Sequence, residues 1–380
     1  MSPKPEGSRP ADPTQSSGGV LTEEPPAASA AARQSARPVG SRLLERLIPR
    51  PATADGGGVT SLDRSARRRA FVGQIGVPLM GLALIVVFSL IADNFLTGSN
   101  IKDIFSQAAL PLIVATGLTI CLSMGEFDLS LNGVAGLATV LMAVLVARKG
   151  MSPLLAIPLV LALGVGIGAV NGVLVGYFGV AALIVTIAVN SILQGWEFVV
   201  SGSVQIFGGF PPGLVSFARG SVLGIPTLVL IAAAVAWLAW VLLERTTLGR
   251  HLRAIGGNAE AARIAGVNTA RVKLAGFIIT ALLASLAGLL FAARETNAYP
   301  LNGLDVLLPS FAACFIGAAM FKIGEFNIPG TIVGVMIAQI TANGLILLNV
   351  ATYASYFFQG IILLIALLFA RVVVTGGRST

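Results

Sequence analysis

Ten long apolar segments, separated by short polar breaks, constrain the fold of this chain more than any other feature. A helix needs about 20 apolar residues to cross the roughly 30 Å hydrocarbon core of a bilayer. The segments that approach this length lie near residues 73–92, 108–124, 131–147, 154–176, 181–199, 222–243, 274–293, 306–321, 331–349 and 355–372. Three of them, the second, third and eighth, are short, which predicts broken or tilted helices. We therefore expect an all-α polytopic membrane protein with about ten transmembrane helices.

Composition and charge support a membrane protein. Hydrophobic residues make up 55% of the 380 residues, charged residues only 11%, and the mean hydropathy is +0.87. The net charge of +8 does not indicate nucleic acid, because basic residues gather where cytoplasmic loops would hold them, beginning with the three arginines at 67–69. With ten helices, all but five of the 25 Lys and Arg residues fall on the side of the N-terminus, the exceptions being Lys102, Arg148, Lys149, Arg219 and Arg294. This distribution predicts that both termini are cytoplasmic, with residues 125–147 as the place where a miscounted helix would reverse the topology.

The chain divides into three parts by composition. Residues 1–70 are rich in Pro, Ala, Ser, Gly and Arg, which predicts a disordered cytoplasmic tail, although Ser41–Ile48 has helical spacing that suits a membrane surface. A cleaved signal peptide is not expected, because the first long apolar segment begins only near residue 75. The transmembrane domain is expected over 71–373, with a large loop at 244–273, followed by a short cytoplasmic tail at 374–380.

No enzyme motif is found in the sequence. It has no phosphate-binding glycine loop followed by Lys and Ser/Thr, and no Cys/His set with metal-ligand spacing. The single histidine, His251, lies in a solvated loop, and Cys121 and Cys314 fall in apolar segments, where a thiol packs like any small side chain. We therefore predict no catalytic residues, no metal site and no disulfide.

The polar loop between the sixth and seventh segments predicts a short helix. Asn258 follows Gly256-Gly257 and precedes the helix-favouring AEAARIA, which stops at Gly266, so Asn258 suits the N-cap and Gly266 the left-handed exit. Such a helix of about two turns is too short to be stable alone. Its alanine face suits a groove on another protein, with a charged rim of Arg250, Arg253, Arg263 and Arg271. An ordinary cytoplasmic loop explains the same residues.

Three segments resemble a known family of membrane proteins. They are TTLGRHLRAIGGNAEAARIAGVNTARVKLAGFIITALLASLAGLL at 246–290, ATGLTICLSMGEFDLSLNGVAGLATVL at 115–141 and NGVLVGYFGVAALIVTIAVNSILQGW at 171–196. All three are similar to permeases of ribose-type ABC importers, and the resemblance extends over residues 72–372. The sequence departs from the family at Glu126, where a glycine is usual, and in 301–331, which carries Lys322 and Glu325.

The resemblance implies a type II importer-like permease in the bacterial cytoplasmic membrane, surrounded by lipid. Its implied partners are an ABC ATP-binding protein that binds ATP and Mg, an extracytoplasmic sugar-binding protein, and a second permease copy, with a homodimer favoured over a heterodimer. No cofactor is expected in this chain, and no nucleic acid. The loop helix would then dock in the ATPase, with Gly256 and Gly257 allowing close backbone approach. The implied coupling residues are Arg250, Arg253, Gly256, Gly257, Asn258, Glu260, Ala261, Ala262 and Gly266.

Polar residues within or beside the apolar segments are candidates for the substrate pathway. Asp128 suits a cap for a helix that begins near Leu129, shared with Ser130, and Glu126 suits an ion pair at the inner membrane boundary. Asn190, Gln194 and Glu197 recur at helical spacing beside Trp196, where they fit either sugar contacts or interhelical hydrogen bonds. Asn343 has the same two interpretations. The pathway candidates are therefore Glu126, Asp128, Ser130, Asn190, Gln194, Trp196, Glu197 and Asn343.

The expected function is import of a monosaccharide, such as a pentose or hexose, driven by ATP on a partner. A branched-chain amino acid or nucleoside permease of the same class is the nearest alternative. Two other classes remain open: an ion-coupled secondary carrier that uses Glu126 and Asp128, and a membrane anchor or receptor component without transport activity.

Overall fold

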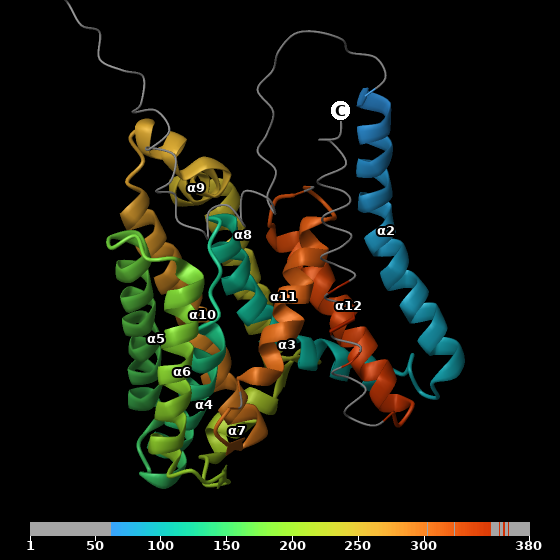
Figure 1. Ribbon diagram of the computed structural model, residues 1–380. Coiled ribbons are helices and arrows are strands. Elements are labelled where there is room, and N and C mark those ends of the chain that lie inside the picture. Colours follow the sequence, from blue (N-terminus) through green and yellow to red (C-terminus); the bar gives the residue numbers. More distant parts are fainter. Residues whose placement is uncertain are drawn as a thin grey trace, which may run out of the picture. The chain divides into compact units, whose positions relative to one another are not determined.

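The computed structural model describes residues 62–350 except 302 and 323, together with 357, 360, 361 and 364 (Figure 1). Side chains are described from residue 76 onward, except at 304 and 305. The described residues lie in one unit of the chain, Glu45–Thr380. The predicted surface helix at 41–48, most of the predicted N-terminal tail and the tail at 374–380 fall outside them. The first described helix begins at Leu62, which lies within the range 1–70 predicted as a tail.

The described residues are almost entirely helical. The helices are α2 (Leu62–Ile91), α3 (Gly98–Ser123), α4 (Leu131–Ala143), α5 (Pro153–Gly176), α6 (Ala182–Ser201), α7 (Pro212–Arg219), α8 (Thr227–Arg245), α9 (Thr247–Ile264), α10 (Thr269–Glu295), α11 (Leu304–Ala318) and α12 (Ile328–Leu347). A π-helical turn, η1 (Val144–Arg148), continues α4. Two short antiparallel pairs complete the structure: β1 (Ile206–Phe207) with β4 (Asn297–Ala298), where Ile206 faces Ala298, and β2 (Ser221–Val222) with β3 (Ile225–Pro226).

The lengths of these helices confirm a polytopic all-α membrane protein. Seven are long and apolar enough to cross a bilayer, namely α3, α4 with η1, α5, α6, α8, α10 and α12. Shorter apolar helical segments, Gly76–Ile91 and Val306–Ala318, belong to α2 and α11. The tenth predicted helix, 355–372, lies outside the described residues apart from 357, 360, 361 and 364, so the total of ten stays a prediction.

Two of the predicted boundaries are wrong. The second segment is not a short span from 108, because α3 begins at Gly98, where the Thr97 hydroxyl caps it by accepting a hydrogen bond from the Asn100 amide at 3.4 Å. The sixth does not begin at 222, because a β2–β3 hairpin with Gly224 at φ +82° precedes α8. The third segment was expected to be short and broken or tilted, but it runs without a break from Leu131 to Arg148 through the π-helical turn.

Helix α10 packs against α5, α4 and α3, and its seam with α5 depends on glycine. A Cβ atom on Gly168 would lie 2.6 Å from the carbonyl oxygen of Phe277, and one on Gly172 would lie 2.6 Å from the Cα of Leu274. Both distances are shorter than real contacts allow. The glycine-rich run at 163–172 therefore serves close helix packing, as is common in membranes.

Helices α11 and α12 pack on each other and on α3. The hydroxyl oxygens of Thr119 on α3 and Thr331 on α12 lie 2.7 Å apart, and the Cys314 thiol of α11 donates to the carbonyl of Ala115 at 3.3 Å. Cys121 and Cys314 are both buried free thiols. Helix α9 contacts α8, α10 and α3 at one end of α8, whereas α7 contacts α8 and α10 near the other end (Figure 1). We call these the α9 end and the α7 end.

Candidate functional site

The loop at 244–273 forms two helical segments that meet at Asn258. The backbone of Asn258 is extended, with φ −160° and ψ 103°, which interrupts α9. Its side-chain oxygen accepts hydrogen bonds from the amides of Glu260 and Ala261, both at 3.1 Å, and therefore caps the second segment. Gly266 follows the helix at φ +87°. The cap and the exit agree with the sequence prediction. We call residues Asn258–Gly266 the docking helix, after the role that the resemblance implies for them.

Most of the docking helix is exposed. Ala262 is its buried side chain, whereas Glu260, Ala261 and Arg263 face away from the rest of the chain. Arg263 pairs with Glu260 at 2.6 Å, and this guanidinium lowers the pKa of the Glu260 carboxyl. Ile264 is 79% exposed. Ile264 was not among the residues predicted from the sequence, although a β-branched apolar residue in an otherwise alanine-rich and polar segment is the signal that identifies it.

The predicted charged rim is only partly present. Arg250, Arg263 and Arg271 are exposed, but Arg253 turns toward the body of the protein and forms an ion pair with Glu244 at the end of α8. Lys322, from the turn between α11 and α12, pairs with the same carboxylate, its Nζ lying 3.1 Å and 3.0 Å from the two oxygens. Glu244 was not among the residues predicted from the sequence.

The two glycines before Asn258 differ in their surroundings. A Cβ atom on Gly256 would lie 2.3 Å from the carbonyl oxygen of Ser123, and one on Gly125, at φ +78°, would lie 3.3 Å from the Cα of Gly256. Gly257 has nothing within 4 Å of such an atom. We expected both glycines to allow close approach to a partner. Gly256 instead allows α9 to pack on the connection between α3 and α4 of the same chain.

Glu126, in the connection between α3 and α4, lies in an ion pair. Its Oε1 is 2.5 Å from the Nζ of Lys273, near the start of α10, and both side chains are largely buried. The expected pairing with a basic residue is therefore present. Because Lys273 ends the 244–273 loop, the ion pair attaches that loop to the same connection that Gly256 contacts.

Asp128 lies two residues farther along the same connection and is fully buried. Its Oδ1 accepts from the amide of Ser130 at 2.9 Å and from the Ser130 hydroxyl at 2.6 Å, and Asn171 of α5 donates to that hydroxyl oxygen at 2.7 Å. Burial raises the pKa of Asp128 to about 6, although the hydrogen bonds from Ser130 oppose the shift. Helix α4 begins at Leu131 rather than near Leu129, so Asp128 orders the residue before the helix.

The polar set on α6 makes contacts with other parts of the chain. Asn190 accepts a hydrogen bond from the amide of Gly133 at 2.9 Å, in the first turn of α4, and buried Glu197 accepts one from the amide of Leu301 at 2.6 Å. Gln194 is partly exposed, and Trp196 is 54% exposed. Asn190 and Glu197 therefore join elements of the fold.

Asn343 on α12 is paired in the same way. Its side-chain amide and that of Asn100 on α3 exchange two hydrogen bonds, at 3.0 Å and 2.9 Å, and both residues are buried. This reciprocal pair satisfies both amides within the chain, which agrees with the structural interpretation of Asn343.

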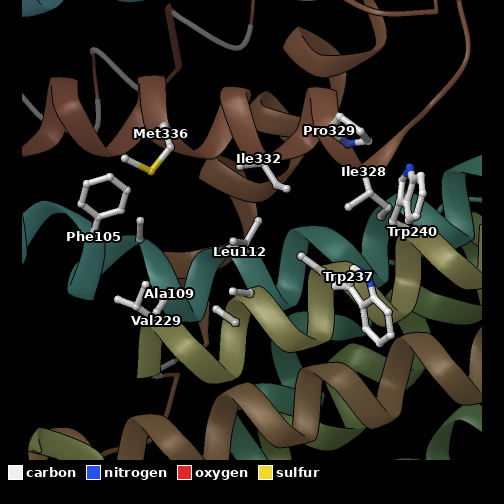
Figure 2. A pocket seen from close by; sticks show the side chains of 14 residues that line it. Phe105, Ala109, Leu112, Val229, Trp237, Trp240, Ile328, Pro329, Ile332 and Met336 are labelled. Atoms are coloured by element: carbon white, nitrogen blue, oxygen red, sulfur yellow. The ribbon is translucent and has the colours of Figure 1, made fainter. Parts of the chain in front are cut away.

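A cavity of about 430 Å³ lies between α3, α8 and α12. Figure 2 shows Phe105 and Met336 at one end of it and Trp240, Ile328 and Pro329 at the other. The lining is apolar, and the predicted polar candidates are not among the residues that line it. Glu126, Asp128 and Ser130 lie in the connection between α3 and α4, where Glu126 contacts α10 and Ser130 contacts α5, whereas Asn190, Glu197 and Asn343 lie at separate contacts with other parts of the chain.

Comparisons with known proteins agree on one class of protein. The family described as branched-chain amino acid transport system / permease component matches residues 100–367. The ribose import permease protein RbsC of Escherichia coli (strain K12) is 34% identical over 290 residues, which cover 76% of this chain and 90% of that protein. The ribose import permease of Bacillus subtilis (strain 168) is 34% identical over 296 residues, covering 77% and 92%. The L-arabinose transport system permease protein AraH of Escherichia coli (strain K12) is 32% identical over 308 residues, covering 78% and 90%. No solved structure matches.

Proposed function

The chain belongs to the family of transport-system permease components, and from this premise we propose that it is the membrane-spanning subunit of an ATP-driven importer of a monosaccharide. As a permease component it is a transport subunit and not an enzyme. The observation that carries the proposal is the docking helix, a capped helix on the chain's surface that is too short to be stable without the body it packs on.

The substrate class rests on the relatives. Ribose, L-arabinose and D-allose are the sugars named for proteins that are 34%, 32% and 32% identical to this chain. All three are monosaccharides, which supports a pentose or hexose here. The description of the matching family names branched-chain amino acids, so a branched-chain amino acid is an alternative substrate. The transport assay must distinguish a sugar from this alternative and from a nucleoside.

The distribution of charge supports an orientation with the α9 end in the cytoplasm. The α9 end carries a dense set of basic residues, namely Arg245, Arg250, Arg253, Arg263, Arg271, Lys273 and Lys322. Cytoplasmic loops retain such an excess of Lys and Arg. The α7 end then faces outward, and the protein lies in a bacterial cytoplasmic membrane.

The docking helix has the properties of a partner-binding element. Exposed Ala261 leaves room for close contact, and exposed Ile264 offers an apolar side chain at the cytoplasmic end, where solvent would otherwise cover it. An amphipathic helix that enters a groove commonly anchors itself by such residues. In this proposal the groove belongs to an ATP-binding protein, which binds ATP and Mg and moves the docking helix when it closes.

Two further partners complete the proposed importer. An extracytoplasmic sugar-binding protein would deliver substrate at the α7 end, and a second permease copy would form the other wall of the pathway, in a homodimer. Affinity for sugar then resides in the binding protein. Weak contacts suffice within the permease, which fits the scattered positions of Asn190, Glu197 and Asn343.

The proposal is tested by reconstitution with the ATP-binding protein and the binding protein that copurify with the chain. Uptake of radiolabelled D-ribose, L-arabinose, D-allose, L-leucine and adenosine into proteoliposomes is measured with and without ATP. ATP-dependent uptake of one of the sugars is expected. Uptake of leucine or adenosine alone would support the alternative substrates instead, and the absence of any uptake that requires ATP would refute an ATP-driven importer.

The role of the docking helix is tested by adding bulk to it. Replacing Glu260 and Ala261 with tryptophan is expected to abolish the coupling of ATP hydrolysis to uptake, with the chain still inserted in the membrane. Leu155→Trp, on an exposed part of α5, is the control for added bulk. Wild-type uptake by the double variant would remove the assignment of this helix.

An ion-coupled carrier remains the second candidate because it has an observation of its own. Buried Asp128 has its pKa raised to about 6, within the range that a proton carrier uses. The hydrogen bonds of Asp128 to Ser130 and the ion pair of Glu126 with Lys273 favour structural roles for both. Uptake by the permease alone, driven by a proton gradient, would support the carrier.

A further inference from the structure

Glu244, in the last turn of α8, is shared by two cations from different parts of the chain. The Nη1 of Arg253 donates to Oε2 at 3.2 Å, and its Nη2 donates to Oε1. The Nζ of Lys322 donates to both oxygens, at 3.1 Å and 3.0 Å. One carboxylate thus connects α8, α9 and the turn between α11 and α12.

This cluster lies at one end of the cavity between α3, α8 and α12. Trp240, one turn before Glu244 on α8, lines the cavity, as does Ile328, the first residue of α12 after the turn that carries Lys322. Both are at the same end of the cavity in Figure 2. The guanidinium of Arg245 lies over the ring of Trp240, 5.5 Å from its centroid, which is within the range of a cation–π interaction. The Glu244–Lys322 ion pair therefore joins the end of the helix that forms one wall of the cavity to the turn that precedes the helix of another wall, at the α9 end.

The turn that carries Lys322 is hydrogen-bonded to the start of α12. Asn327 caps that helix by accepting from the amide of Gly330 at 2.8 Å, and its side-chain amide donates to the carbonyl of Glu325 at 3.0 Å. These bonds fix the turn to the helix that follows. Helix α12 packs much more extensively on α11 and α3 than on α8, so few other contacts hold the α8 and α12 walls together.

The other wall is fixed to α9. Thr246 lies between α8 and α9, and its hydroxyl donates to the carbonyl of Leu242 at 2.6 Å while it accepts from the amide of Gly249 at 3.2 Å. Arg253 then reaches back from α9 to Glu244. A displacement of α9 must therefore change the position of the carboxylate that Lys322 binds.

We propose that the Glu244–Lys322 ion pair is a latch that closes the α9 end of this cavity, and that Arg253 couples the latch to α9. The side chain of Lys322 is 45% exposed, and ion pairs of this exposure are weak enough to break and re-form during a transport cycle. The latch is inferred only from the positions of the ion pair and the cavity. That an ATP-binding protein moves α9 rests on the proposed function.

The latch is tested by chemical access to the cavity. Ile332→Cys places a thiol in the lining, and Cys121 and Cys314, both fully buried, are the background. The rate at which a charged methanethiosulfonate reagent labels this thiol is measured by mass spectrometry in nanodiscs. Adding Lys322→Gln or Glu244→Gln is expected to raise the rate about fivefold or more, the lower range for coupling between two elements.

Two further variants separate the latch from general loosening. Lys322→Arg keeps the cation and is expected to restore the slow rate. Glu325→Gln changes a charge in the same turn without contact to Glu244 and is expected to have no effect. Equal labelling rates in all of these folded variants would overturn the latch, and so would an equal rise in Glu325→Gln.

The coupling to α9 is tested in the complex with the ATP-binding protein. ATP is expected to change the labelling rate of Ile332→Cys, and Arg253→Gln is expected to remove that change. A wild-type complex without any ATP effect would contradict the proposed function and leave the latch measurement intact. An ATP effect that persists in Arg253→Gln would overturn the coupling role of Arg253 alone.

Discussion

Gly256 of α9 lies so close to Ser123 at the end of α3 that a Cβ atom on it would sit 2.3 Å from the Ser123 carbonyl oxygen. Beside this contact, Lys273 and Glu126 form an ion pair that attaches the start of α10 to the same connection. The docking helix is therefore continuous with a segment that packs, backbone to backbone, on the connection leading to Asp128. These contacts join the segment before the docking helix, and the start of α10, to the connection between α3 and α4.

Gly256→Ala is expected to destabilise the protein by about 1–3 kcal/mol, the usual cost of added volume in a packed site. The added methyl group meets backbone atoms, which cannot turn aside as a side chain would. The midpoint of thermal unfolding in detergent measures the effect. Gly257→Ala is the matched control, because its methyl group meets nothing within 4 Å. Equal midpoints for the two variants would show that α9 does not pack on Ser123.

Ile264→Ser is expected to weaken binding of the ATP-binding protein by about 1–2 kcal/mol, as removal of an anchor residue does in other interfaces. The side chain is 79% exposed, so the stability of the isolated chain is expected to stay unchanged. Titration of the ATP-binding protein onto the nanodisc-held chain measures the affinity. Ile264→Leu keeps the apolar contact and is expected to bind like the wild type, and full affinity in Ile264→Ser would exclude Ile264 from the interface.

The sequence predicted those features that depend on neighbouring residues. The cap at Asn258 and the exit at Gly266 are local, because each involves amides within a few positions of the residue that satisfies them. Likewise, the length of an apolar run predicts most spans. The exceptions are α3 and α8, where a capping threonine and a short hairpin decide the first turn.

The hydrogen-bond partners of the buried polar residues could not be predicted from neighbouring residues. Asn343 pairs with Asn100, and Glu197 accepts from Leu301, across separations that no local pattern records. Helical spacing predicted that Asn190 and Glu197 share a face, but sugar binding and helix contact require the same donors and acceptors. Gly256 shows the same limit, because the sequence indicated close approach without showing that the approached backbone is the chain's own.

The stability of the protein is expected to depend on pH through Asp128. Its pKa in the folded chain is about 6, raised by burial from 3.8. The protonated carboxyl therefore favours the folded state. The stabilisation that protonation of Asp128 gives is fully present below the unfolded pKa and is lost as pH rises through about 6, so the free energy of unfolding falls by about 3 kcal/mol. The free energy of unfolding of the wild type minus that of Asp128→Asn, measured from pH 4 to about 7, isolates this group.

Asp128→Asn is the matched replacement because its carbonyl oxygen can still accept from the Ser130 amide. The free energy of unfolding of the wild type minus that of Asp128→Asn is expected to fall by about 3 kcal/mol between pH 4 and about 7. A difference that stays constant with pH would mean that Asp128 titrates near its ordinary pKa.

The reciprocal amide pair of Asn100 and Asn343 is expected to act in stability and not in substrate binding. Each single alanine variant leaves a buried amide of the other residue without one partner, which costs about 1–3 kcal/mol. The double variant is expected to cost less than the sum, with a coupling of about 0.6 kcal/mol, as is typical between membrane helices. Unfolding in detergent gives these values.

Uptake assays give KM for the sugar in the same variants. Because both side-chain hydrogen bonds of Asn343 go to Asn100 on α3, KM is expected to stay within about twofold of the wild-type value, well under the tenfold that 1.4 kcal/mol of lost binding would produce. A tenfold rise in KM without loss of stability would return Asn343 to the substrate pathway.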